Sequence, residues 1–157
     1  MACPTWPRST AGTSSRRYAV AGELLLDTGA LVSLLDRSQK EHARFAAFFG
    51  NWTGTVVSTE AVLTEATHLL GGLRGGRQAC VDFFLSGATI LVPATRAALR
   101  RCRDLLHQYA DLPMDYADAT LVVLAEELGT NRVFTTDRRD FSVYRIKGRR
   151  RFDILPG

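Results

Sequence analysis

Residues 23–36, with the sequence ELLLDTGALVSLLD, are the starting point for interpreting the whole chain. The three leucines at 24–26 form an apolar run without a polar helical face, which predicts a buried β-strand. The run stops at Asp27, a turn follows, and apolar residues then recur at helical spacing over 30–35. Asp27 is therefore expected at the carboxyl edge of a sheet, where open α/β sheets bind ligands. Asp also caps helices, so the stretch alone leaves a cap and a functional site equally open.

The composition is that of a single globular domain. The chain has 157 residues, of which 46% are hydrophobic and 23% charged. No apolar run approaches the ~18 residues of a membrane helix, and no secretory signal is recognised, which favours a cytoplasmic protein without membrane contact. Cys3, Cys80 and Cys102 lack paired spacing and are expected to be reduced thiols. The net charge of +4 is a mild indication of an anionic partner.

The remaining pattern divides the chain into a leader and one domain. Residues 1–22 are rich in Pro, Ser, Thr, Gly and Arg without periodicity, which predicts a flexible leader. Within residues 23–157, further short strands are predicted at 55–57, 89–92, 132–134 and 152–155, alternating with helices. This alternation predicts an α/β fold, with about five short strands in a parallel sheet.

Several helix ends and faces are predicted from local signals. A helix is expected to continue over 38–49, Ser58 is expected to cap the next one, and Pro113 suits the first position of a helix over 114–128. Leu69 and Leu99 are expected on the buried faces of two of these helices, because they continue the apolar spacing.

Four acidic residues stand at comparable places in this pattern. Asp27 and Asp137 each follow a strand, Asp118 lies in the first turn of a helix, and Glu65 borders the apolar face of another. Carboxylates gathered at one edge of a sheet repel each other unless a cation neutralises them. Mg²⁺ or Mn²⁺ suits such oxygen ligands. For Glu65 alone, an ordinary solvated position is the simpler interpretation.

The segments that carry these acids also resemble a known family. LLLDTGALVSLLD, the helix of Glu65, DLPMDYADATLV and VFTTDRRDF are similar in order and spacing to PIN domains, and more narrowly to the VapC-type toxins of bacterial toxin–antitoxin pairs. The resemblance covers about residues 23–157. It implies a PIN-like three-layer α/β/α sandwich and a Mg²⁺- or Mn²⁺-dependent endoribonuclease that cuts RNA with metal-activated water. It further implies a cognate antitoxin protein and a homodimer.

The resemblance assigns roles to individual positions. Its catalytic residues fall on Asp27, Glu65, Asp118, Asp137 and Thr135. The four acids would hold the metal, with Thr28 and Asp115 as accessory candidates. Asp140, three residues after Asp137, competes with it for the role of last ligand.

Basic residues near the end of the chain are candidates for weak RNA contacts. They are Arg138, Arg139, Arg145 and Lys147, together with a stripe at Arg96, Arg100, Arg103 and His107. A solvated surface explains the residues near the end of the chain equally well, and it is the usual explanation of such a stripe. The rival interpretation of the whole chain is a catalytically inactive PIN-like module that binds RNA or protein. The intact set of four acids argues against it, because clustered negative charge does not help to bind an anion.

Overall fold

The structure, a computed structural model, describes residues 22–157. All but the last residue of the predicted leader, 1–22, therefore lies outside the described residues. In chain order the elements are β1 Leu24–Leu26, α1 Thr28–Leu35, α2 His42–Asn51, β2 Val56–Thr59, α3 Glu60–Leu69, η1 Leu70–Gly72 (a 3-10 helix), α4 Gly76–Leu85, β3 Ile90–Val92, α5 Arg96–Gln108, α6 Tyr116–Leu128, β4 Arg132–Phe134, α7 Arg138–Val143, β5 Arg145–Ile146, β6 Arg150–Arg151 and β7 Asp153–Leu155.

The central sheet is parallel throughout and has the strand order β3-β2-β1-β4-β7. β1 lies in the middle, where Leu25 pairs with Val57 of β2 on one side and with Val133 of β4 on the other. Since all five strands point the same way, the residues that follow β1 and β4 lie at one edge of the sheet. The predicted α/β fold with five short parallel strands is confirmed.

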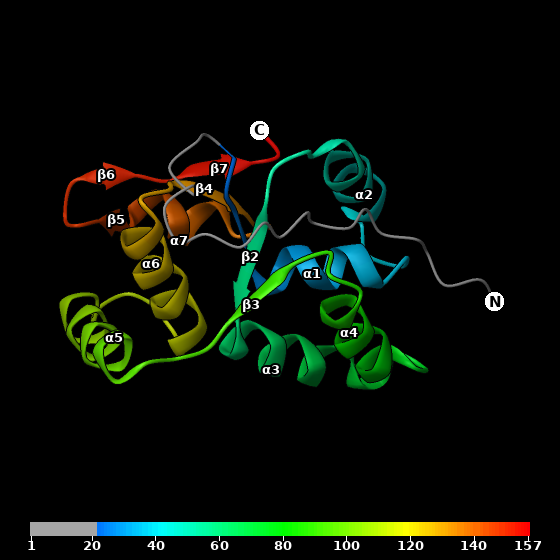
Figure 1. Cartoon of the computed structure of the whole chain (residues 1–157), viewed down its shortest axis with the longest axis horizontal. Coiled ribbons are helices and arrows are strands. Elements are labelled where there is room, and N and C mark those ends of the chain that lie inside the picture. The colour runs from blue at the N-terminus through cyan, green and yellow to red at the C-terminus, as the bar shows by residue number, and fades with distance from the viewer. Residues whose placement is uncertain (1–21) are drawn as a thin grey trace.

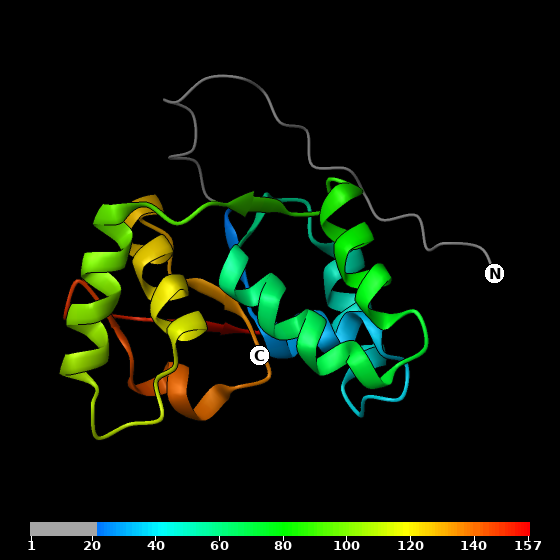
Figure 2. The same ribbon diagram turned by 90° about the horizontal axis from the view of Figure 1, so that it is seen from below.

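The helices cover both faces of this sheet, as the predicted sandwich requires. Figure 1 shows α5 and α6 on one side of the strands and α1, α2 and α4 on the other. The turned view in Figure 2 keeps the two groups apart, with α3 between them. No helix in residues 22–157 is long and apolar enough to cross a membrane.

The core fills the space between the sheet and both helix layers. Leu24–Leu26 are inaccessible to solvent, which is why β1 shows no alternation of apolar and polar residues. On one face, the rings of Phe45 in α2 and Phe134 in β4 stack with centroids 4.8 Å apart. On the other face, α6 buries a continuous run from Leu121 to Ala125, because it packs against β1 and β2 on one side and against α5 on another.

Several predicted helix ends were wrong because polar side chains near them form local hydrogen bonds with the backbone that the sequence pattern leaves open. The helix expected over 38–49 begins only at His42. Thr59, not Ser58, caps α3, since Ser58 instead donates its hydroxyl to the Leu26 carbonyl across the sheet. The last long helix starts three residues after Pro113, with Asp115 as its N-cap.

Two predicted core positions were also wrong. Leu69 is 57% exposed and Leu99 is 47% exposed. In α5 the buried face instead includes Cys102 and Leu105. The apolar spacing of α5 fits two adjacent faces of the helix, and only its packing against α6 selects one of them.

Candidate active site

Asp27 occupies the N-cap position of α1 without acting as a cap. Its backbone is extended, yet its side chain makes no capping hydrogen bond, although the Thr28 backbone N–H also interacts with the carboxylate. One carboxylate oxygen, Oδ2, instead accepts a 2.6 Å hydrogen bond from the Thr135 hydroxyl, which comes from the residue after β4. The sequence left open whether Asp27 caps the helix or belongs to a functional site. These contacts argue against a simple capping role.

Thr135 connects Asp27 to Asp137. The same hydroxyl accepts a 2.8 Å hydrogen bond from the Asp137 backbone N–H. Asp137 is the N-cap of α7, where its Oδ1 accepts the Asp140 N–H at 2.9 Å. The parallel pairing of β1 with β4 thus brings together three of the residues predicted for the site.

A glycine allows the loop after β4 to lie close to the start of α1. A Cβ placed on Gly29 would overlap the side-chain oxygen of Thr136. A larger residue at position 29 would therefore displace the Thr136 side chain, in the loop that carries Thr135 and Asp137.

Glu65 points toward this edge of the sheet and is not an ordinary solvated residue. Its Oε2 accepts a 2.7 Å hydrogen bond from the Thr28 hydroxyl, and its side chain is half-buried on α3. Its negative charge also raises the pKa of Asp27. The structure therefore joins Glu65 to Thr28 by a direct contact that the sequence analysis did not predict.

Asp118 completes the acidic cluster, which we define as Asp27, Glu65, Asp118 and Asp137. Its Oδ2 accepts a 3.0 Å hydrogen bond from the hydroxyl of Tyr144, a residue that the sequence analysis missed. Asp115, in contrast, is exposed and caps α6 by accepting the Asp118 N–H.

Burial and like charge raise the pKa of two members of the cluster. The pKa of Asp27 rises to about 6, first because the side chain is buried and further because Glu65 and Asp137 lie nearby. The pKa of Asp118 rises to about 7, again mainly through burial, with added repulsion from Asp115 and Asp27. Both carboxylates therefore lie in surroundings that disfavour their charged form.

No basic side chain neutralises this cluster in the part of the chain that the structure describes. The ion pairs between residues 22 and 157 lie elsewhere, and they are Arg44–Glu41, Arg101–Glu126 and Arg103–Asp104. Nor do any three His, Cys, Asp or Glu side chains of that range stand in an arrangement that could hold a metal ion without adjustment. The donor set itself, carboxylate oxygens with no competing cation, matches the ligands that Mg²⁺ and Mn²⁺ prefer.

A groove of about 640 Å³ opens beside the cluster, between α3, α6 and the segment that joins β3 to α5. Its apolar lining includes Val92, Pro93 and Val123. Glu65 and Asp115 line the groove as well, so an occupant of the groove would lie next to the acidic residues.

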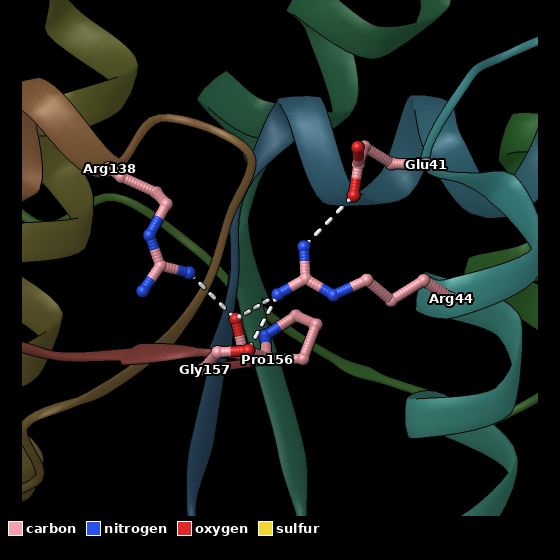
Figure 3. A network of polar contacts seen from close by, with 5 residues as sticks. All are labelled: Glu41, Arg44, Arg138, Pro156 and Gly157. Carbon is pink, nitrogen blue, oxygen red and sulfur yellow. Dashed lines mark hydrogen bonds and ion pairs between the residues drawn. The ribbon is translucent and has the colours of Figure 1, made fainter.

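Two of the residues predicted to contact RNA have partners within the protein. Arg138 donates to the Pro156 carbonyl at 2.7 Å, and Arg44 donates to the carbonyls of Pro156 and Gly157, as Figure 3 shows. Arg145 donates to the carbonyls of residues 142–144 at the end of α7. These arginines therefore have structural contacts that no local sequence pattern indicates.

The other predicted basic contacts face solvent. Arg139 and Lys147 are exposed, and so are the four members of the stripe on α5. Lys147 lies in the turn between β5 and β6 with a positive φ of 49°.

Comparison with known proteins agrees with this fold. The family model of the PIN domain matches residues 24–147, and the chain belongs to that family. A curated relative, ribonuclease VapC26 of Mycobacterium tuberculosis, is 28% identical over 135 residues, which cover 85% of this chain and all of the relative.

Solved structures share the fold at lower sequence identity. VapC20 of Mycobacterium tuberculosis, described as a toxin that cleaves the sarcin–ricin loop, superposes with a TM-score of 0.67 at 19% identity, over 74% of this chain and 91% of that one. VapBC2 of Rickettsia felis, solved with a DNA fragment from its promoter, gives a TM-score of 0.57 at 15% identity, over 84% and 96% of the two chains. A toxin–antitoxin complex from Klebsiella pneumoniae gives the same TM-score and identity, over 76% and 91%.

Proposed function

We propose that this PIN-domain protein is a metal-dependent endoribonuclease and the toxin of a toxin–antitoxin pair. The observation that carries the proposal is the acidic cluster, whose carboxylates converge from four segments, in part buried, without a basic partner in residues 22–157. A fold gains nothing in stability from such repulsion, so the cluster calls for a cation. The relation to a ribonuclease over 85% of the chain supports RNA as the substrate.

Each residue of the cluster has a defined part in this proposal. The four acids would hold Mg²⁺ or Mn²⁺, which when bound activates water and stabilises negative charge on a phosphate. The Thr135 hydroxyl orients Asp27, and the Thr28 hydroxyl orients Glu65. Each hydroxyl donates to only one of the two carboxylate oxygens. Asp137 takes the position of the last acid, because its backbone N–H is fixed by Thr135.

The test of the proposal is RNA cleavage by the purified protein. We expect cleavage with Mn²⁺ or Mg²⁺, loss of cleavage in EDTA, and loss of cleavage in Asp118→Asn. Mapping the cut sites at nucleotide resolution would define the substrate. Metal-independent binding of RNA without cleavage would instead support an inactive binding module.

The proposal includes an antitoxin encoded beside this gene. Two of the similar solved structures are toxin–antitoxin complexes. We expect an apolar segment of the antitoxin to occupy the groove next to Glu65 and Asp115, with a Lys or Arg directed to the acids. The test is co-expression: the toxin alone should slow growth, and the neighbouring gene product should bind it and restore growth.

The homodimer and the cytoplasmic location stay predictions. The buried free thiols of Cys80 and Cys102 are compatible with a reducing compartment. A mass of twice 17.3 kDa in light scattering would establish the dimer.

A further inference from the structure

We propose that Tyr144 is a positioning residue for Asp118, and that its hydroxyl fixes the orientation in which this carboxylate binds the metal. The inference rests on the proposed function and extends it to a residue outside the predicted site. It is carried by the 3.0 Å hydrogen bond from the Tyr144 hydroxyl to Asp118 Oδ2.

The bond belongs to a pattern that repeats across the acidic cluster. Three of the four carboxylates accept one hydrogen bond from a hydroxyl: Asp27 from Thr135, Glu65 from Thr28, and Asp118 from Tyr144. In each case the donor comes from a different segment than the acid, so the packing of the fold sets the orientation of the carboxylate. Partners of this kind orient metal ligands in proteins generally.

Tyr144 is itself held firmly, which a positioning residue requires. Its side chain is inaccessible to solvent. Its ring meets the edges of the Tyr109 and Phe141 rings, at centroid distances of 5.3 and 5.5 Å. Its backbone N–H donates to the Asp140 carbonyl at the end of α7. The ring contacts on both sides hold the hydroxyl where it donates to Asp118.

The hydroxyl is also buried, and the ring contacts alone do not require it. Phe at position 144 would keep both ring contacts, and would avoid burying a polar group beside a cluster of negative charge. A hydrogen-bond donor at this position is explained if one oxygen of Asp118 accepts its hydrogen bond while the other oxygen is directed to a metal ion.

The test compares two tyrosines that pack against each other. Tyr144→Phe removes the donor to Asp118. Tyr109→Phe removes a hydroxyl that accepts the Arg145 N–H and touches no member of the cluster. Mn²⁺ affinity is measured by calorimetry on the free proteins without RNA, with circular dichroism as the check of folding.

We expect Tyr144→Phe to bind Mn²⁺ about 10-fold more weakly, as is usual for loss of a residue that orients a ligand. Tyr109→Phe should bind Mn²⁺ like the wild type. In the cleavage assay, the KM of Tyr144→Phe for RNA should be unchanged, because the buried ring cannot touch the substrate, and kcat should recover as Mn²⁺ is raised. When Asp118→Asn is already present, adding Tyr144→Phe should cause no further loss of Mn²⁺ affinity.

Different failures have different meanings. Equal Mn²⁺ affinity of Tyr144→Phe and the wild type would overturn the role of Tyr144 alone. If both Tyr→Phe variants lost the same Mn²⁺ affinity, or if Tyr144→Phe did not fold, the hydroxyl would be needed for packing in general. Either result would overturn the positioning role of Tyr144. A wild-type protein that binds no Mn²⁺ would overturn the metal site, and this inference with it.

Discussion

Thr135 uses a single hydroxyl for two contacts at the carboxyl edge of the sheet. It donates to the Asp27 carboxylate and accepts from the Asp137 N–H, and it is 1% exposed. A buried carboxylate that keeps one strong hydrogen bond tolerates its charge better than one with none. Even so, burial outweighs this bond, because the pKa of Asp27 is raised and not lowered. The metal-free protein therefore carries a local destabilisation at this residue.

Removing that charge should make the metal-free protein more stable while abolishing cleavage. We expect Asp27→Asn to raise the free energy of unfolding by on the order of 2 kcal/mol at pH 7.5 in EDTA, from a pKa raised to about 6. Asp118→Asn should act in the same direction. Denaturant unfolding and the RNA cleavage assay measure the two effects. Wild-type cleavage by either variant would remove that residue from the catalytic assignment.

The same pKa shifts predict how stability depends on pH. A carboxyl whose folded pKa lies above its usual value binds more protons in the folded state, so its penalty is absent at low pH and grows as the pH rises. For Asp27 and Asp118 the window runs from about pH 4 to about pH 7. We expect the stability gain of Asp27→Asn over the wild type to be larger at pH 7.5 than at pH 5 in EDTA. Saturating Mn²⁺ should abolish the gain, and a gain independent of pH would contradict the assignment.

At the scale of elements, the site depends on how closely the loop after β4 approaches α1. The parallel pairing of the two strands sets the ends of β1 and β4 side by side, and Gly29 lets the backbone around Thr136 come near. α3 and α6 then supply one acid each from their exposed or half-buried faces. No single element forms the site.

Gly29→Ala should therefore lower both stability and Mn²⁺ affinity, because the new Cβ displaces the loop that carries Thr135 and Asp137. We expect a loss of about 1 kcal/mol of stability, in the range of modest overpacking. Gly50→Ala in α2 is the matched control: a Cβ there meets no atom within 4 Å, and Ala favours a helix by roughly 0.5–1 kcal/mol. It should stabilise the protein and leave Mn²⁺ binding unchanged. Equal metal affinity in both variants would show that the close approach is irrelevant to the site.

At the scale of the whole molecule, a net charge of +4 coexists with the acidic cluster. Binding of RNA to such a protein requires basic groups that are not already engaged within the fold. Arg138 and Arg145 have internal partners, whereas Arg139 and Lys147 are exposed. The exposed pair is therefore better suited to meet phosphates.

Arg139→Ala should weaken RNA binding to the Asp118→Asn protein, which we expect to bind RNA without cutting it. Loss of one phosphate contact should reduce the slope of log affinity against log salt by about 0.7 for a single strand. Arg74, exposed in the turn before α4, is the matched control, and Arg74→Ala should leave the slope unchanged. Titration of fluorescent RNA at several salt concentrations measures both. A smaller slope in the Arg74 variant than in the Arg139 variant would assign the RNA path to the other end of the molecule.

The sequence by itself determined the five strands of the central sheet, most of the helices, and the positions of Asp27 and Asp137 at one edge of that sheet, but not the small antiparallel sheet of β5 and β6. These features follow from periodicity and from turn residues, which act over a few neighbours. Only the tertiary structure decided that Asp27 is bonded by Thr135, that Tyr144 reaches Asp118, and that Arg138 is engaged by the last residues of the chain. The exposure of Leu99 was decided in the same way. Such contacts join residues far apart in the chain, and their geometry depends on how whole helices pack against the sheet, which no local pattern encodes.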